Sequence, residues 1–308
     1  MRKPRPLKSG DRIAVVAPAS PFARDEFDRG VAELQRLGFE PTWDDSVFAN
    51  EYGYLAGAAD VRAHAFLEHW NDPSVSALIA VRGGYGSVHM LPLLHPPALV
   101  AAPKLFIGYS DNTSLLSWLN CGCGITGLHG PMLDRRLSSG AAGYDERSFL
   151  ALTADGTGLE LAPEGVEVLR PGRVQGPLFG GTIAQLVASL GTPFAFDPPD
   201  GCVLFLEDVN ERPYRIDRML TQLRLSGVLG RARGLIFGEM RGCDEPGGGA
   251  VTAREVIARL TVGFSGPVLF GFPSGHTSGP CWTLPFGVDV RVESSPRPFV
   301  VIEDSAVA

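Results

Sequence analysis

The chain of 308 residues is long enough for about two domains, and its 44% hydrophobic and 20% charged residues are typical of a globular protein with a large core. A net charge of −7 disfavours a broad nucleic-acid-binding surface. No apolar run approaches the roughly 20 residues that a membrane-spanning helix needs, and the basic N-terminal segment lacks the apolar stretch of a secretion signal. We therefore expect neither a nucleic-acid nor a membrane partner.

The five cysteines are odd in number and scattered along the chain. Cys121 and Cys123 are too closely spaced for a metal knuckle, and no histidine lies at a partner spacing. We expect small buried thiols in a reducing cytosol, and neither a metal nor a cofactor.

The first half of the chain shows a β-α-β pattern from its start. An apolar strand begins at Arg12, a helical periodicity covers 22–37, and Gly38 ends the helix before a strand at 39–43. This order predicts an α/β protein with a parallel sheet and helices on its faces. The other elements expected here are a helix at 54–70, strands at 75–81 and 105–107, a helix at 114–119 and a strand at 125–132.

The second half follows a stretch without periodicity. Residues 140–172 are rich in Gly, Ala, Pro and Glu, so we place a connector there between an N-terminal domain (1–139) and a C-terminal domain (173–308). The elements expected beyond it are helices at 183–190, 214–225 and 251–260, strands at 203–206, 234–239 and 267–273, a loop at 244–249, and an antiparallel pair at 288–292 and 299–301.

Ser110 lies between the strand at 105–107 and the following helix. A serine on such a sharp turn exposes its hydroxyl, as in the nucleophile elbow of α/β-hydrolases, and the helix N-terminus offers free N–H groups to an oxyanion. Gly108 is in the expected place two residues earlier, but Asn112 replaces the second glycine of the Gly-x-Ser-x-Gly pattern. An ordinary turn serine that caps a helix is the alternative.

Other polar residues also follow predicted strands. Glu207 comes directly after the strand at 203–206, and His276 follows the strand at 267–273. Serine, acid and histidine in this order match the α/β-hydrolases, in which histidine takes the serine proton and a buried carboxylate holds the imidazole. His129 is a further candidate base or an ordinary strand-end histidine. The glycine loop 82–87 could bind an anion or be a plain turn.

Five blocks of the sequence together resemble the LD-carboxypeptidase family of serine peptidases, which also includes the microcin C self-immunity peptidases. The blocks are Val16–Pro21; Arg82–Ser87; Gly108–Asp111 with Gly130–Met132; Leu206–Asp208 with Pro213–Leu220; and Gly271–Pro273 with Gly275–His276. They cover nearly the whole chain in the order of the family. Two departures are Thr182, where relatives often have asparagine, and Asn112, where they usually have an apolar residue.

The resemblance implies a role for each matching residue. Ser110 would be the nucleophile, Glu207 the acid and His276 the base of a triad. Oxyanion donors would be the backbone N–H groups of Asp111 and of the glycine loop, most of all Gly84 beside Gly83. For the substrate's terminal carboxylate, Arg82 is either a clamp or a structural arginine that holds its loop.

The resemblance also implies a fold and a substrate. We expect an N-terminal flavodoxin-like parallel sheet with helices on both faces, a smaller β-rich α/β domain at the C-terminus, a site between them, and a homodimer. The implied reaction is release of C-terminal D-alanine from murein tetrapeptides in the cytoplasm. Alternatives are hydrolysis of an aminoacyl- or peptidyl-nucleotide amide, a non-catalytic two-lobed binding protein, and a cysteine amidase that uses Cys121 or Cys123.

Overall fold

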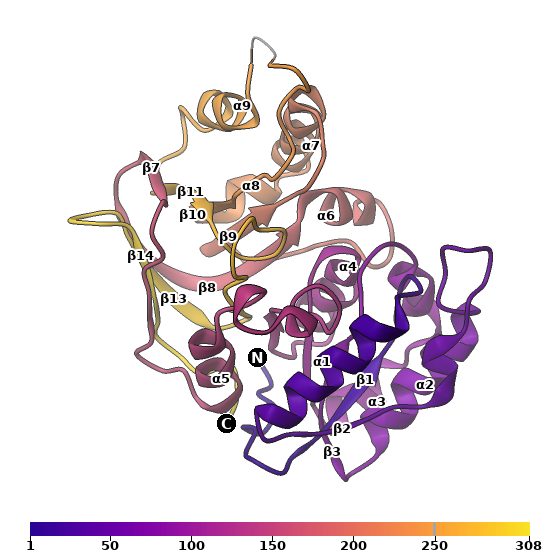
Figure 1. Cartoon of the computed structure of the whole chain (residues 1–308). Helices are drawn as coiled ribbons and strands as arrows, with labels where there is room; N and C mark the ends of the chain where they lie inside the picture. Colours follow the sequence, from indigo (N-terminus) through magenta and orange to yellow (C-terminus); the bar gives the residue numbers. More distant parts are fainter. Residues whose placement is uncertain (249–250) are drawn as a thin grey trace.

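The computed structural model describes residues 1–248 and 251–308 and contains two sheets, the first built mainly from the first half of the chain and the second from the second half (Figure 1). The last residue of the predicted loop 244–249 lies outside the described residues. The backbone N–H of Ala308 donates to the carbonyl of Pro4 (2.9 Å), so the two ends of the chain lie together.

The N-terminal sheet has the strand order β12-β5-β4-β3-β1-β2, and all its strands are parallel except β12. Its strands are β1 (Arg12–Val16), β2 (Glu40–Thr42), β3 (Val75–Ala80), β4 (Leu105–Gly108), β5 (Gly127–His129) and β12 (Leu284–Phe286). The order 2-1-3-4-5 is that of flavodoxin-like folds, so the predicted architecture is confirmed. The edge strand β12 belongs to the second half of the chain, which the sequence did not indicate.

Helices and short helical turns connect these strands. The helices are α1 (Arg24–Arg36), α2 (Ala59–Asn71), α3 (Pro96–Ala101) and α4 (Thr113–Ser117), and the turns are η1 (Asp45–Phe48), η2 (Ser87–Leu93), η3 (Ser110–Asn112), η4 (Trp118–Gly122) and η5 (Leu137–Ala142). The helix predicted from residue 54 begins only at Ala59, because Gly57 has a positive φ of 90° and Ala58 is extended.

The C-terminal sheet has the order β6-β14-β13-β8-β9-β10-β11-β7, with β8 to β11 parallel and antiparallel strands on both sides. Its strands are β6 (Glu160–Leu161), β7 (Glu167–Arg170), β8 (Arg173–Thr182), β9 (Cys202–Glu207), β10 (Ala232–Gly238), β11 (Val268–Phe272), β13 (Asp289–Glu293) and β14 (Phe299–Ile302). The helices in this part of the chain are α5 (Glu146–Ala154), α6 (Ile183–Ser189), α7 (Pro213–Leu225), α8 (Val228–Arg231) and α9 (Ala253–Leu260). The predicted antiparallel closing pair is confirmed as β13 and β14.

The range 140–172 contains more structure than its composition indicates. It includes α5, β6 and β7, and the two strands are too short to show a periodicity. The sequence pattern does not predict strand β8, because glycines interrupt its apolar residues. Gly180 is required by close packing, since a Cβ on it would lie 1.8 Å from the carbonyl oxygen of Phe205 on β9. The predicted domain boundaries stay a prediction.

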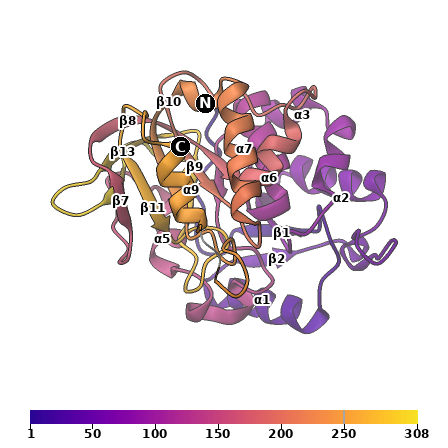
Figure 2. The same cartoon turned by 90° about the horizontal axis from the view of Figure 1, so that it is seen from above.

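The two halves share an extensive contact. Helix α6 packs against α4 of the first half and α7 of the second, and Figure 2 shows α6 beside α7, toward the first half. The buried cluster around the N-terminal sheet extends to Val290 on β13 and Ile302 on β14. Helix α4, which follows Ser110, therefore lies where the two halves meet.

Candidate active site

Ser110 has a positive φ of 64°, which is unusual for a residue with a side chain. One residue, Tyr109, separates it from the end of β4, and Ser110 begins the turn η3, which continues into α4. Strain of this kind persists only where the surrounding structure enforces it, and a strained serine between strand and helix is the geometry of a nucleophile elbow. The predicted local structure around Ser110 is therefore present.

The glycine loop packs directly against this serine. A Cβ on Gly83 would lie 2.8 Å from the Cβ and 2.9 Å from the Oγ of Ser110, so a larger residue would displace the hydroxyl. The buried Asp111 carboxylate accepts the backbone N–H of Ser87 (2.8 Å), and the Ser87 hydroxyl donates to the Asp111 carbonyl (2.7 Å). Gly84 has a positive φ of 105°. The structure thus brings Ser110, Asp111, Gly83 and Gly84 together.

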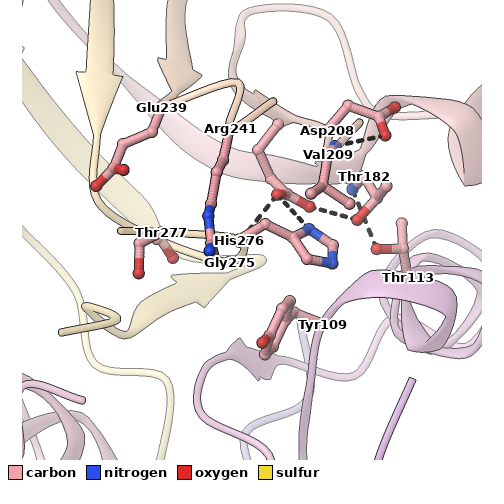
Figure 3. Close-up of polar contacts among 12 residues, drawn as sticks. Tyr109, Thr113, Thr182, Asp208, Val209, Glu239, Arg241, Gly275, His276 and Thr277 are labelled. Carbon is pink, nitrogen blue, oxygen red and sulfur yellow. Dashed lines mark hydrogen bonds and ion pairs between the residues drawn. The ribbon is translucent and has the colours of Figure 1, made fainter. Parts of the chain in front are cut away.

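Glu207 and His276 form a pair in the second half. Glu207 ends β9 and is only 1% exposed, and its Oε2 lies 2.8 Å from His276 Nδ1 (Figure 3). The same oxygen accepts the backbone N–H of His276 (3.1 Å). A Cβ on Gly275 would lie 2.8 Å from Glu207 Cδ, so glycine is required beside the acid. The histidine side chain is 19% exposed and can meet a ligand.

Electrostatics keep this carboxylate charged. Burial raises the pKa of Glu207, but the charge of His276 and the hydrogen bonds from His276 and Thr182 outweigh burial and lower the pKa to about 2. With Glu207 ionised, Nδ1–H of His276 donates to the carboxylate, so Nε2 is the ring nitrogen that faces away from the acid and that takes up a proton when the imidazole acts as a base.

Tyr109 links His276 to the nucleophile turn. Its ring lies edge-on to the His276 ring with centroids 5.1 Å apart, and Ser110 is the next residue (Figure 3). The Tyr109 hydroxyl accepts from Nε of Arg136 (3.1 Å). Nη2 of Arg136 donates to the carbonyls of Gly275 (2.8 Å) and Thr277 (3.3 Å), on either side of His276. Arg136 therefore holds the histidine loop against the first half of the chain.

Thr182 and Thr113 complete the network around the acid. The Thr182 hydroxyl donates to Oε1 of Glu207, and the Thr182 backbone N–H donates to the Thr113 hydroxyl (3.1 Å) (Figure 3). Thr113 lies one turn after Ser110. Sequence reasoning missed Thr113, Thr182 and Arg136 as site residues. Only Thr182 gave a signal, as a departure from the family pattern.

Replacing Thr182 by valine removes the donor to Glu207 but keeps the side-chain shape. We expect kcat to fall about tenfold with little change in KM, because a buried carboxylate oxygen loses a charge-assisted hydrogen bond. Steady-state kinetics of Thr182→Val and Thr182→Ser measure this. Thr182→Ser retains the hydroxyl and should keep most of the activity, and equal losses in both variants would contradict a role for the hydroxyl.

Arg82 lies beside a buried aspartate. Its Nε is 3.7 Å from Asp134 Oδ2, and Asp134 is 1% exposed. Burial raises the pKa of Asp134 to about 7, although the Arg82 guanidinium opposes this shift. The contact supports the structural alternative for Arg82 over the carboxylate clamp.

His129 and the cysteines are not placed for catalysis. His129 is fully buried, its Nδ1 lies 2.9 Å from Ser274 Oγ, and burial lowers its pKa to about 4. Burial raises the pKa of Cys121 to about 12 and that of Cys123 to about 11, so neither is a thiolate at neutral pH. In the described ranges, no three His, Cys, Asp or Glu side chains are grouped to hold a metal ion. None of the helices described there has the length and apolar character needed to cross a bilayer.

An elbow serine and a histidine held by a buried carboxylate are the means by which hydrolases activate a hydroxyl. The class that the fold and site define is thus a serine hydrolase built from two α/β domains. Comparison with known proteins identifies the family: residues 13–130 match the LD-carboxypeptidase N-terminal domain and residues 175–292 match the LD-carboxypeptidase C-terminal domain. The chain belongs to the LD-carboxypeptidase family of serine peptidases, and the resemblance noted in the sequence is confirmed.

Individual relatives extend over nearly the whole chain. The murein tetrapeptide carboxypeptidase of Pseudomonas aeruginosa is 32% identical over 274 residues, which cover 86% of this chain and 88% of that protein. The structure of muramoyltetrapeptide carboxypeptidase from Oxalobacter formigenes has a TM-score of 0.83 and 28% identity, with 96% and 99% of the chains covered. The microcin C7 self-immunity protein MccF, solved in complex with aspartyl sulfamoyl adenosine, has a TM-score of 0.89 and 25% identity, with 100% of both chains covered.

Proposed function

We propose that this protein is a serine carboxypeptidase that releases C-terminal D-alanine from murein tetrapeptides by cleaving the amide between an L-centre and the D-residue. The observation that carries the proposal is the fully buried Glu207, which pairs with His276 beside the strained turn of Ser110. Relatives named for murein peptides supply the substrate class.

The proposed mechanism assigns one task to each group. Ser110 Oγ attacks the scissile carbonyl while His276 Nε2 takes its proton, and Glu207 stabilises the resulting imidazolium. The backbone N–H groups of Asp111 and Gly84 stabilise the oxyanion. His276 then protonates the leaving amine, and a water molecule, activated by the same imidazole, hydrolyses the acyl-enzyme.

A second candidate is hydrolysis of an aminoacyl- or peptidyl-nucleotide amide. The observation that favours it is the similarity to MccF, which was solved with an aspartyl sulfamoyl nucleoside. Both candidates use the same triad and differ in the substrate that it cleaves, above all in whether a D-amino acid or a nucleotide leaves. The cytoplasmic location and homodimer implied by the resemblance stay proposals, and the five free thiols support a reducing compartment.

The decisive experiment is mass-spectrometric detection of free alanine from a murein tetrapeptide. We expect release from the peptide that ends in D-alanine and none from the matched peptide that ends in L-alanine, because the site must read the configuration at the leaving residue. Aspartyl sulfamoyl adenosine is assayed in parallel on the same preparation. Faster turnover of the nucleoside than of the D-peptide would contradict the first candidate and support the second.

A further inference from the structure

A cavity of about 270 Å³ opens beside the acid–histidine pair. Tyr109, His276 and three arginines, Arg135, Arg136 and Arg241, are among its lining residues. The arginines come from both halves of the chain, and Figure 3 shows Arg241 extending toward the segment around Gly275 and His276. This part of the site is therefore a basic cavity directly at the catalytic histidine.

Only two of the three guanidinium groups are available to a ligand. Arg136 is buried, and its guanidinium donates to protein oxygens, including the carbonyls of Gly275 and Gly279 (2.8 and 3.2 Å). Arg135 and Arg241 are exposed, and within 1–248 and 251–308 no carboxylate lies at ion-pair distance from either. A cavity that presents two such cations suits an anionic group.

The backbone presents these two side chains through strained geometry. Arg135 has a positive φ of 58°, and the N–H of Arg136 bonds to the carbonyl of Asp134 (2.5 Å) in a three-residue turn around it. Met240, which precedes Arg241, has a positive φ of 50°. Such conformations are strained in residues with side chains and tend to occur at ligand-binding sites.

The position of the cavity relates it to one side of the scissile bond. In the proposed mechanism His276 protonates the leaving amine, so the leaving residue must lie on the side of His276 and not on the side of the glycine loop. The free carboxylate of a C-terminal residue is attached to the carbon that carries this nitrogen. It must therefore lie within a few ångströms of the imidazole, where the cavity opens.

We propose that Arg135 and Arg241 bind the C-terminal carboxylate of the leaving residue and so make the enzyme a carboxypeptidase. This inference rests on the proposed function and names the specificity-determining side chains of the same site. Arg82 is less suited to this role, because its Nε lies 3.7 Å from the buried carboxylate of Asp134, which competes for the guanidinium. Two separate guanidinium groups provide enough donors for both carboxylate oxygens.

Two substrates that differ only at the terminus test the assignment: the tetrapeptide ending in D-alanine and the same peptide ending in D-alaninamide. We expect the wild type to prefer the free acid. Arg135→Gln and Arg241→Gln should each raise KM for the free acid about tenfold to a hundredfold and leave KM for the amide unchanged, since each loses charged hydrogen bonds to the carboxylate. Arg224→Gln, on the exposed side of α7, is the control for loss of one positive charge.

The possible failures separate the two proposals. The carboxylate assignment would be overturned if the wild type cleaved the free acid and the amide equally well, or if KM rose equally for both substrates in the variants. Either outcome would leave the proposed peptidase function in place. Adenosine monophosphate is the probe for a competing anion, a phosphate group. If it inhibits the wild type, and if each arginine substitution abolishes this inhibition but leaves KM for the tetrapeptide unchanged, the two arginines bind phosphate and the carboxylate assignment is overturned. Cleavage of neither peptide by the wild type would overturn the proposed function and this assignment with it. Circular dichroism and Arg135→Lys, which keeps the charge, exclude misfolding as the cause of a loss.

Discussion

The Ser110→Ala protein should lose essentially all amidase activity, with kcat about 10⁵- to 10⁶-fold below that of the wild type. The positive φ of 64° presents the side chain of residue 110 at the turn between β4 and α4, and the substitution removes the only atom that can form the acyl-enzyme there. The measurement is release of D-alanine from the tetrapeptide under single-turnover conditions, because a slow contaminant would dominate steady-state rates.

The control keeps the fold and the cavity. Ser114→Ala removes a hydroxyl one turn further along, where Ser114 donates to Gln185 Oε1 (3.1 Å), and should retain activity. The tetrapeptide should still bind to Ser110→Ala with an affinity near the wild-type KM. An acylating reagent should label the wild type at Ser110. A wild type that is never labelled and releases no D-alanine would favour a binding protein, whereas a Ser110→Ala variant that still releases D-alanine would contradict a covalent step at this serine.

The parts of the site at strand ends could be predicted from the sequence because local patterns determine their position. Ser110, Glu207 and His276 each follow an apolar strand, and the carboxyl ends of parallel strands are where ligands bind in α/β folds. The pairing of Glu207 with His276, at 2.8 Å, agrees with their predicted roles. The parallel direction of the strands in the first sheet also follows from the repeated β-α-β pattern, whereas their flavodoxin-like order was implied only by the family resemblance.

The remaining parts depend on contacts between distant segments. Arg136 acts through carbonyls 139 and 141 residues further along the chain, and no local pattern marks it. Strand β12 leaves the second half to join β5, and its three residues have no periodicity of their own. The glycines of β8 broke the expected strand pattern, although Gly180 is required there by the close approach of β9. In these places tertiary packing overrides the local signal.

Replacing Glu207 by glutamine should lower kcat about 10⁴-fold with a small change in KM. The amide oxygen can still accept from His276, and the amide nitrogen can donate to the Thr182 hydroxyl, so the geometry is preserved. The negative charge that stabilises the imidazolium is lost. Stopped-flow and steady-state kinetics of Glu207→Gln measure the effect. A variant within tenfold of the wild type would show that His276 is oriented without this charge, and the triad assignment would fail.

The same substitution has a signature in stability that does not depend on any substrate. The pKa of Glu207 is lowered from an unfolded value of 4.5 to about 2, so its charged form stabilises the fold fully above about pH 4.5, and this contribution is lost as the pH falls through 2. The free energy of unfolding of the wild type should therefore fall by up to about 3 kcal/mol more than that of Glu207→Gln over this range. Urea titrations of both proteins at several pH values between 6 and about 2.5 measure the difference. Parallel curves for the two proteins would mean that the buried carboxylate gains nothing from His276 and Thr182, and the electrostatic basis of the proposed mechanism would be lost.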